Sequence, residues 1–228
     1  MRKWINSIIK NLKGEDYSLD KRIPLSYLLR LALSRLMMAA RGGISGVKHT
    51  GFLFIAGHVT IKASSLFRTG RNVSIDKGCF IDALSTDGLV FGNNVSMGKN
   101  VRIECTGDFQ LIGKGMVVGN NVGLGADSFF GCAGGIHIGD DTILGNYVSF
   151  HSENHLYDNL HIPIRQQGSS REGISVGKNC WIGAKATLLD GATIEDGCVI
   201  AAGAVLTAGI YKANGIYGGV PARLIKYR

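Results

Sequence analysis

The sequence has few prolines, no long hydrophobic run and no paired cysteine motif. Only 3 of its 228 residues are proline and 45% are hydrophobic, which excludes a collagen-like or proline-rich disordered chain. No uninterrupted apolar run reaches about 18 residues, and the N-terminus lacks an apolar region followed by a small-residue cleavage site. The sequence therefore predicts neither a membrane-spanning helix nor an exported protein.

The five cysteines are odd in number and form no C-x-x-C pair: Cys79, Cys105, Cys132, Cys180 and Cys198. Neither a disulfide framework nor a cysteine zinc site is indicated. A reducing environment fits this usage, so we expect a cytoplasmic protein, at most attached to the inner face of the membrane.

Acidic residues are scarce near the N-terminus. The net charge is +8, and residues 1–48 carry ten bases against three acids, or 10 − 3 = +7. The rest of the chain has no basic stripe interleaved with aromatics, so nucleic acid is not the expected partner. An acidic membrane surface or an acidic partner fits the N-terminal charge better.

An internal repeat of six residues decides the architecture, and 33 glycines accompany it. Aliphatic residues recur at Val176, Ile182, Leu188, Ile194, Ile200 and Leu206. A small residue stands four places further in most of these hexads, at Cys180, Ala186, Ala192, Cys198 and Ala204. The same spacing is found earlier in two separate runs, one at Phe91, Met97 and Ile103 and one at Ile112, Val118, Leu124 and Phe130. A period of six is neither the 3.6 of a helix nor a long alternation; it indicates short strands joined by turns.

Three such sides close one triangular coil, in which the aliphatic residues point inward and stack on the next coil. The predicted fold is all-β, a left-handed parallel β-helix of hexapeptide repeats with an N-terminal helical segment and one ejected loop. We expect a basic segment at 1–48, the β-helix at 49–211 with a loop at 151–173, and a C-terminal cap at 212–228. A leucine-rich helix is predicted over 24–41, either capping the first coil or contacting a membrane surface.

The repeat is interrupted between Phe150 and Ile174, and three of the six histidines, His151, His155 and His161, lie in the interruption. A long loop ejected from a regular scaffold is typical of function. A histidine can take a proton from an acceptor hydroxyl and return it to a thiolate, as acyl transfer from a thioester requires. Glu153, Asp158 or Glu172 could orient the imidazole.

Four motifs carry a resemblance to a known family: Ile138-Gly139-Asp140-Asp141, Asn154-His155, the stretch from Val176 to Gly183, and Gly219-Val220-Pro221-Ala222-Arg223. Over residues 110–228 the sequence resembles the hexapeptide-repeat O-acetyltransferases of the galactoside, maltose and capsular polysaccharide type. The resemblance implies acetyl-CoA as co-substrate, a homotrimer and no metal, with His155 as the general base.

The same resemblance assigns the cofactor contacts. It implies Trp181 in the reaction cleft and the backbone N–H of Ala184 at the thioester oxygen. It implies pantetheine and phosphate contacts at Ala202, Gly203, Thr207, Arg223 and Lys226. Ala208 departs from the family, since many relatives carry a lysine there. Residues 127–132 lack the asparagine of galactoside-specific members, which leaves the acceptor open.

The expected activity is transfer of an acetyl group from acetyl-CoA to a sugar hydroxyl of a polysaccharide or a lipid-linked precursor. Three alternatives remain. The acceptor could be the amine of an amino-sugar nucleotide. The chain could be a zinc-dependent γ-type carbonic anhydrase using His137, His151 and His155, or a solenoid that only binds a glycan or protein.

Overall fold

The structure is a computed structural model that describes residue 20 and residues 22–228. The part of the basic segment on residues 1–19 and 21 lies outside the described residues. The chain divides into two units, one ending at Met37 and one comprising Met38–Arg228.

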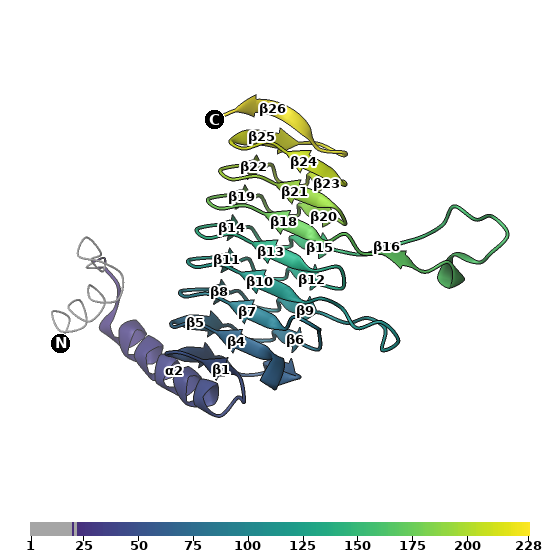
Figure 1. Ribbon diagram of the computed structural model, residues 1–228. Coiled ribbons are helices and arrows are strands. Elements are labelled where there is room, and N and C mark those ends of the chain that lie inside the picture. The colour runs from purple at the N-terminus through teal and green to yellow at the C-terminus, as the bar shows by residue number, and fades with distance from the viewer. Residues whose placement is uncertain (1–19, 21) are drawn as a thin grey trace. The chain divides into compact units, whose positions relative to one another are not determined.

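Most of the second unit is a stack of short coils, and the successive strands of a coil join three different sheets (Figure 1). The first sheet consists of β1 (Lys48–His49), β4 (Phe67–Thr69), β7 (Leu89–Phe91), β10 (Met116–Val118), β13 (Ile136–Ile138), β18 (Ile174–Val176), β21 (Ala192–Ile194) and β24 (Gly209–Tyr211). The second consists of β2 (Leu53–Ile55), β5 (Val73–Ile75), β8 (Ser96–Met97), β11 (Gly123–Leu124), β14 (Ile143–Leu144), β19 (Trp181–Ile182), β22 (Val199–Ile200), β25 (Gly215–Gly218) and β26 (Arg223–Tyr227). The third consists of β3 (Thr60–Lys62), β6 (Phe80–Asp82), β9 (Arg102–Glu104), β12 (Phe129–Gly131), β15 (Ser149–His151), β20 (Thr187–Leu189) and β23 (Val205–Leu206).

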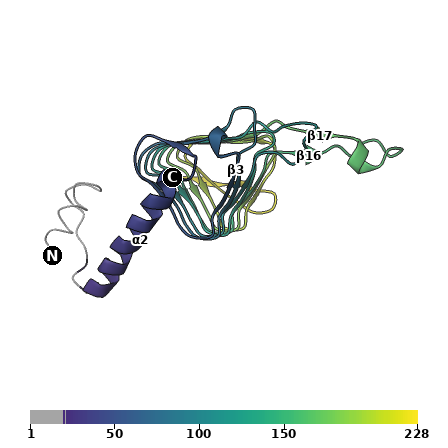
Figure 2. The same ribbon diagram turned by 90° about the horizontal axis from the view of Figure 1, so that it is seen from below.

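These sheets form the three walls of a prism, which Figure 2 shows along its axis. The predicted left-handed parallel β-helix is confirmed. A one-turn 3-10 helix, η1 (Ser64–Leu66), precedes β4. Within these three sheets, every strand from β4 to β24 pairs in parallel with the strand of the same sheet one coil away.

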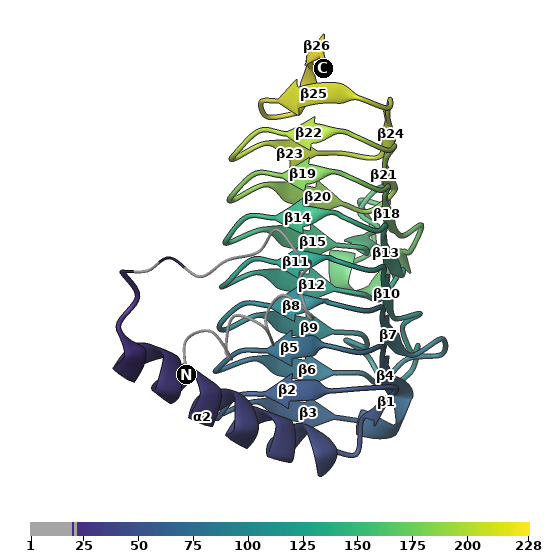
Figure 3. The same ribbon diagram turned by 90° about the vertical axis from the view of Figure 1, so that its left-hand side faces the viewer.

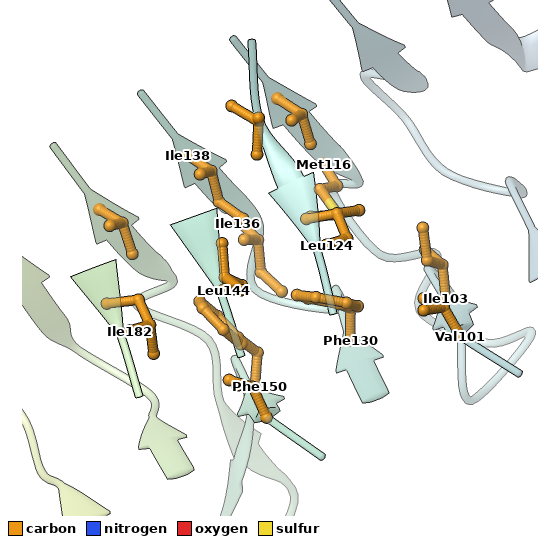
Figure 4. Close-up of a cluster of buried hydrophobic side chains, with 14 of the residues drawn as sticks. Val101, Ile103, Met116, Leu124, Phe130, Ile136, Ile138, Leu144, Phe150 and Ile182 are labelled. Atoms are coloured by element: carbon orange, nitrogen blue, oxygen red, sulfur yellow. The ribbon is translucent and has the colours of Figure 1, made fainter. Parts of the chain in front are cut away.

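The repeated aliphatic residues form the core of the prism. Val176, Ile182 and Leu188 are fully buried, and so are the small residues Ala186 and Ala204. Phe130 and Phe150 stack in successive coils with their ring centroids 5.1 Å apart (Figure 4). Because the aliphatic residue and the small residue of each hexad both point inward, the six-residue spacing encodes a continuous apolar column.

A ladder of amides holds the edge between the first and second sheets. The Nδ2 group of Asn72 donates to Asn94 Oδ1, Asn94 donates to Asn121, and Asn121 donates to Asp141, over 2.8–3.2 Å. All four residues have φ near +57°. Asparagine and aspartate tolerate this left-handed conformation and also offer side-chain partners, which explains their recurrence at the turns.

The predicted N-terminal helix is present as α2 (Leu25–Gly43). Its role as a cap stays a prediction. Among the residues that the structure describes, no helix is both long enough and apolar enough to cross a bilayer.

The C-terminal end of the prism is a hairpin. Strand β26 turns back and pairs antiparallel with β25, with Lys226 opposite Ile216. Ala222, in the connection, is buried. The last residues thus form an additional edge strand. That residues 212–228 cap the prism stays a prediction, as do the domain boundaries at 48 and 211.

Candidate functional site

A long arm leaves the prism where the repeat is interrupted. Residues 152–173, called the arm below, run from β15 in the third sheet to β18 in the first (Figures 1 and 2). Inside the arm, β16 (Asn154–His155) pairs antiparallel with β17 (Ser169–Ser170), and η2 (Ile164–Gln166) lies near its tip. His155 faces Ser169 across this pair and is exposed. The arm therefore presents His155 on a short hairpin outside the prism.

Arg171 braces the root of the arm. Its guanidinium forms an ion pair with Glu153 through Nε, and Nη1 donates to the Leu111 carbonyl oxygen at 3.0 Å. The Arg171 side chain is only 15% exposed, and Ser169 Oγ donates to the same Glu153 carboxylate at 3.1 Å. Glu153, one of three carboxylates considered as a partner for His155, thus serves to hold the arm. The ion pair fixes where the hairpin starts.

Asp190 anchors the returning limb. It is 3% exposed and accepts hydrogen bonds from the Gly173 N–H at 2.7 Å, the Glu172 N–H at 3.1 Å and Ser170 Oγ at 3.2 Å. A buried carboxylate is stable only when its oxygens are satisfied in this way. Both limbs of the arm are therefore tied to the coils beneath.

A second, shorter loop also leaves the prism, and the six-residue spacing does not reveal it. Residues 106–112, called the short loop below, bulge out between β9 and β10, and Phe109 is 86% exposed. Ile112, which the six-residue spacing assigned to the core, is 43% exposed. Ile112 keeps the six-residue spacing but lies in the short loop before β10, and Met116 and Val118 occupy the core positions of this coil. Arg171 connects the short loop to the arm.

His151 and His137 lie on different walls. His151 belongs to β15 in the third sheet, where its ring lies 5.4 Å from that of Phe129 and Nε2 is 2.6 Å from Ser149 Oγ. Partial burial lowers the pKa of His151. His137 belongs to β13 in the first sheet. Among the described residues of this one chain, no three His, Cys, Asp or Glu side chains gather where they could hold a metal ion.

A shallow hollow of about 270 Å³ lies on the first sheet beside the root of the arm. Lys114, His137, Glu172 and Thr193 are among the residues that line it. An amine, an imidazole, a carboxylate and a hydroxyl at one surface suit a ligand with many polar groups.

The expected cleft residues lie on the second sheet and the edge that follows it. Trp181 in β19 is 55% exposed, between Ile143 of β14 and Val199 of β22 in the sheet that Figure 3 shows face-on. Ala184 is in the turn after β19, and its carbonyl oxygen accepts from the Gly203 N–H at 2.9 Å. Ala202 and Gly203 occupy the equivalent turn one coil further, and both are exposed.

The backbone N–H of Ala184 differs from that of Ala126, which occupies the equivalent turn two coils earlier. The Ala126 N–H donates to Asn146 Oδ1 at 3.0 Å, whereas the residue stacked above Ala184 is Ala202, which has no side-chain acceptor. Within the part of the chain that the structure describes, the Ala184 N–H has no hydrogen-bond acceptor. This donor is available to a ligand.

The remaining predicted contacts are spread further. Thr207 follows β23, at the edge between the third and first sheets, and its carbonyl oxygen accepts from Tyr211 Oη at 3.1 Å. Arg223 and Lys226 are exposed on β26. His155 and Thr207 therefore belong to one edge of the prism, whereas Ala184, Ala202 and Gly203 belong to another.

Known proteins share this architecture. Residues 115–148 and 173–208 match the family described as the hexapeptide repeat of succinyl-transferase. The chain is similar in fold to AntD, an N-acyltransferase from Bacillus cereus whose structure is a variant in complex with dTDP and coenzyme A. That similarity has 17% identity, 82% of this chain and 87% of that chain covered, and a TM-score of 0.57.

The chain is also similar to LpxA from Acinetobacter baumannii, with 14% identity, 80% and 70% coverage and a TM-score of 0.58. The UDP-N-acetylglucosamine O-acyltransferase LpxA from Moraxella catarrhalis is a third similar structure, with 15% identity, 79% and 65% coverage and a TM-score of 0.56. Among curated proteins, none matches the chain. At these identities the likeness establishes the fold of a hexapeptide-repeat β-helix.

Proposed function

We propose that this protein is an acyl-CoA-dependent acyltransferase that moves an acetyl group from acetyl-CoA to a hydroxyl of a sugar. The observation that carries the proposal is the braced arm, which presents His155 outside the prism through Arg171, Glu153 and Asp190. Such bracing limits the motion of a general base and so favours productive geometry. The hexapeptide match and the acyltransferase names of the similar structures support the same class.

In the proposed reaction, the neutral imidazole of His155 accepts the proton of the acceptor hydroxyl while that oxygen attacks the thioester carbonyl carbon. The carbonyl oxygen becomes an oxyanion, for which the Ala184 N–H is the free donor. Collapse of the intermediate breaks the carbon–sulfur bond, and the imidazolium returns its proton to the departing thiolate. A new ester and free coenzyme A result.

His155 and Ala184 lie on different edges of one prism, so the proposed site needs two copies of the chain. We propose a homotrimer in which the arm of one copy reaches the edge of its neighbour that carries Ala184, Ala202 and Gly203. Trp181 then lies beside the reacting groups, and Thr207, Arg223 and Lys226 serve the pantetheine and phosphates of the cofactor. Exposed Leu160 and Tyr157 near the arm tip, 93% and 67% accessible, would be covered in such an assembly.

The acceptor proposed is a polysaccharide or lipid-linked sugar. A second candidate is the amine of an amino-sugar nucleotide, which the dTDP complex of AntD favours. The hollow beside Lys114 and His137 supports a polar, hydroxyl-rich acceptor in either case.

The test is release of free coenzyme A from acetyl-CoA across a panel of glycans and amino-sugar nucleotides, with the products identified by mass. We expect His155→Ala to lower kcat by about 10²- to 10⁴-fold. His161→Ala is the matched control, because His161 is exposed in the same arm and no role is assigned to it. Full activity of the His155 variant would refute the proposed base, and an acylated amine in place of an ester would select the second candidate.

A further inference from the structure

Helix α2 presents an exposed apolar stripe. Leu25, Leu29, Leu33, Leu36 and Met37 recur at intervals of three or four, so they share one side of the helix. Their exposed fractions run from 41% to 68%. Along the helix axis the stripe extends over about 18 Å, at about 1.5 Å per residue.

Basic residues border this stripe. At 3.6 residues per turn, Arg30 and Arg41 fall next to Met37 on one flank of the stripe, and Arg35 falls on the other. The helix contains no acidic residue, and residues 1–48 as a whole carry a charge of 10 − 3 = +7. An apolar stripe flanked by arginines is the pattern of a helix that lies in the plane of a membrane surface, with its leucines among the acyl chains and its guanidinium groups at the lipid phosphates.

We propose that α2 binds the surface of a bilayer that contains anionic phospholipid. The stripe is too short for a spanning segment, since a span requires about 20 apolar residues. The acyl chains of a bilayer can surround the four leucines and Met37 without a shaped pocket, whereas an acidic protein partner would need a complementary apolar groove. The charge complementarity selects anionic over neutral lipid. This attachment is independent of the proposed catalytic site, and it would place the acyltransferase beside acceptors at a membrane.

The experiment is flotation of the full-length protein with vesicles of phosphatidylcholine alone or with about 30% phosphatidylglycerol. We expect flotation only with the anionic vesicles. Each arginine near the surface contributes about 1 kcal/mol, so R30Q/R41Q should weaken binding by about thirtyfold. L33Q/L36Q should weaken it at least tenfold, on the order of 1.4 kcal/mol.

Two matched controls carry the same chemical changes elsewhere. K77Q/K99Q removes two exposed bases from the prism, and I210Q/L224Q removes two exposed aliphatic side chains. Both should float like the wild type. Wild-type protein that stays soluble with anionic vesicles would overturn the proposal. Equal losses in the control variants, or equal binding to neutral vesicles, would overturn it as well.

Discussion

Gly125 and Gly123 test how tightly the coils stack. A Cβ atom on Gly125 would lie 2.0 Å from the Gly145 carbonyl oxygen, and restoring an ordinary 3.4 Å contact requires the two coils to separate by about 1.4 Å. The neighbouring contacts are short: the Tyr147 N–H donates to the Ala126 carbonyl at 2.9 Å, and the Ala126 N–H donates to Asn146. Gly125→Ala therefore strains two hydrogen bonds in addition to the steric overlap.

The expected cost follows from these contacts. Overpacking costs about 1–3 kcal/mol and a strained hydrogen bond about 1 kcal/mol, so Gly125→Ala should destabilise the protein by about 3 kcal/mol. For a chain of this length that corresponds to a Tm lower by about 6–12 °C in thermal unfolding followed by circular dichroism.

Gly123 provides the control from the same coil. A Cβ there would meet Ser96 Oγ at 3.7 Å, an ordinary contact. Gly123→Ala should be neutral or stabilise by up to about 1 kcal/mol, because alanine restricts the unfolded chain. The stacking account would be refuted if Gly125→Ala melted like the wild type, or if both variants lost the same stability.

Three further predictions concern the arm, the thiols and pH. Arg171→Met should lower stability by about 2 kcal/mol and lower kcat more than it raises KM, with partial recovery in Arg171→Lys; unchanged kcat would show that Arg171 does not position His155. All five cysteines are buried, and burial raises the pKa of Cys79 and Cys180 to about 11, so a thiol reagent at neutral pH should modify none until the protein unfolds. Hydrogen bonds from Asn120 and the charge of Lys178 lower the pKa of Asp140, so its contribution to stability is present at neutral pH. That contribution is lost as pH falls below the ordinary value of 3.8, so the stability gap between wild type and Asp140→Asn should shrink in acid unfolding curves; a gap that widens in acid would contradict the sign.

The β-helix could be predicted from the sequence because each hexad places the same kinds of residue in the core. Val176, Ile182 and Leu188 recur in register, and the structure buries all three. The short loop escaped prediction because Ile112 keeps the repeat's spacing while lying outside the core. The contacts of Arg171 could not be predicted for another reason. Arg171 binds Glu153 and Leu111, which are 18 and 60 positions away, and no local sequence pattern encodes such a contact.

The candidate site could likewise be predicted only in part. The interruption after Phe150 located the arm and its histidines, because a broken repeat is visible in the sequence. The separation of His155 from Ala184 on different prism edges was not visible, since it depends on which sheet each strand joins. That separation is the reason for proposing a site between two copies.

The most direct test of the proposed shared site is complementation between two inactive variants. The wild-type protein is compared with two variants. His155→Ala lacks the proposed base, and Ala202→Trp places a large side chain at an exposed turn of the proposed cofactor groove. Reassembled from an equal mixture, a trimer with sites between copies combines an intact arm and an intact groove at about a quarter of its sites. We predict that the mixture regains about a quarter of the wild-type coenzyme A release, whereas each variant alone remains inactive. A mixture that assembles normally and stays inactive would contradict the account.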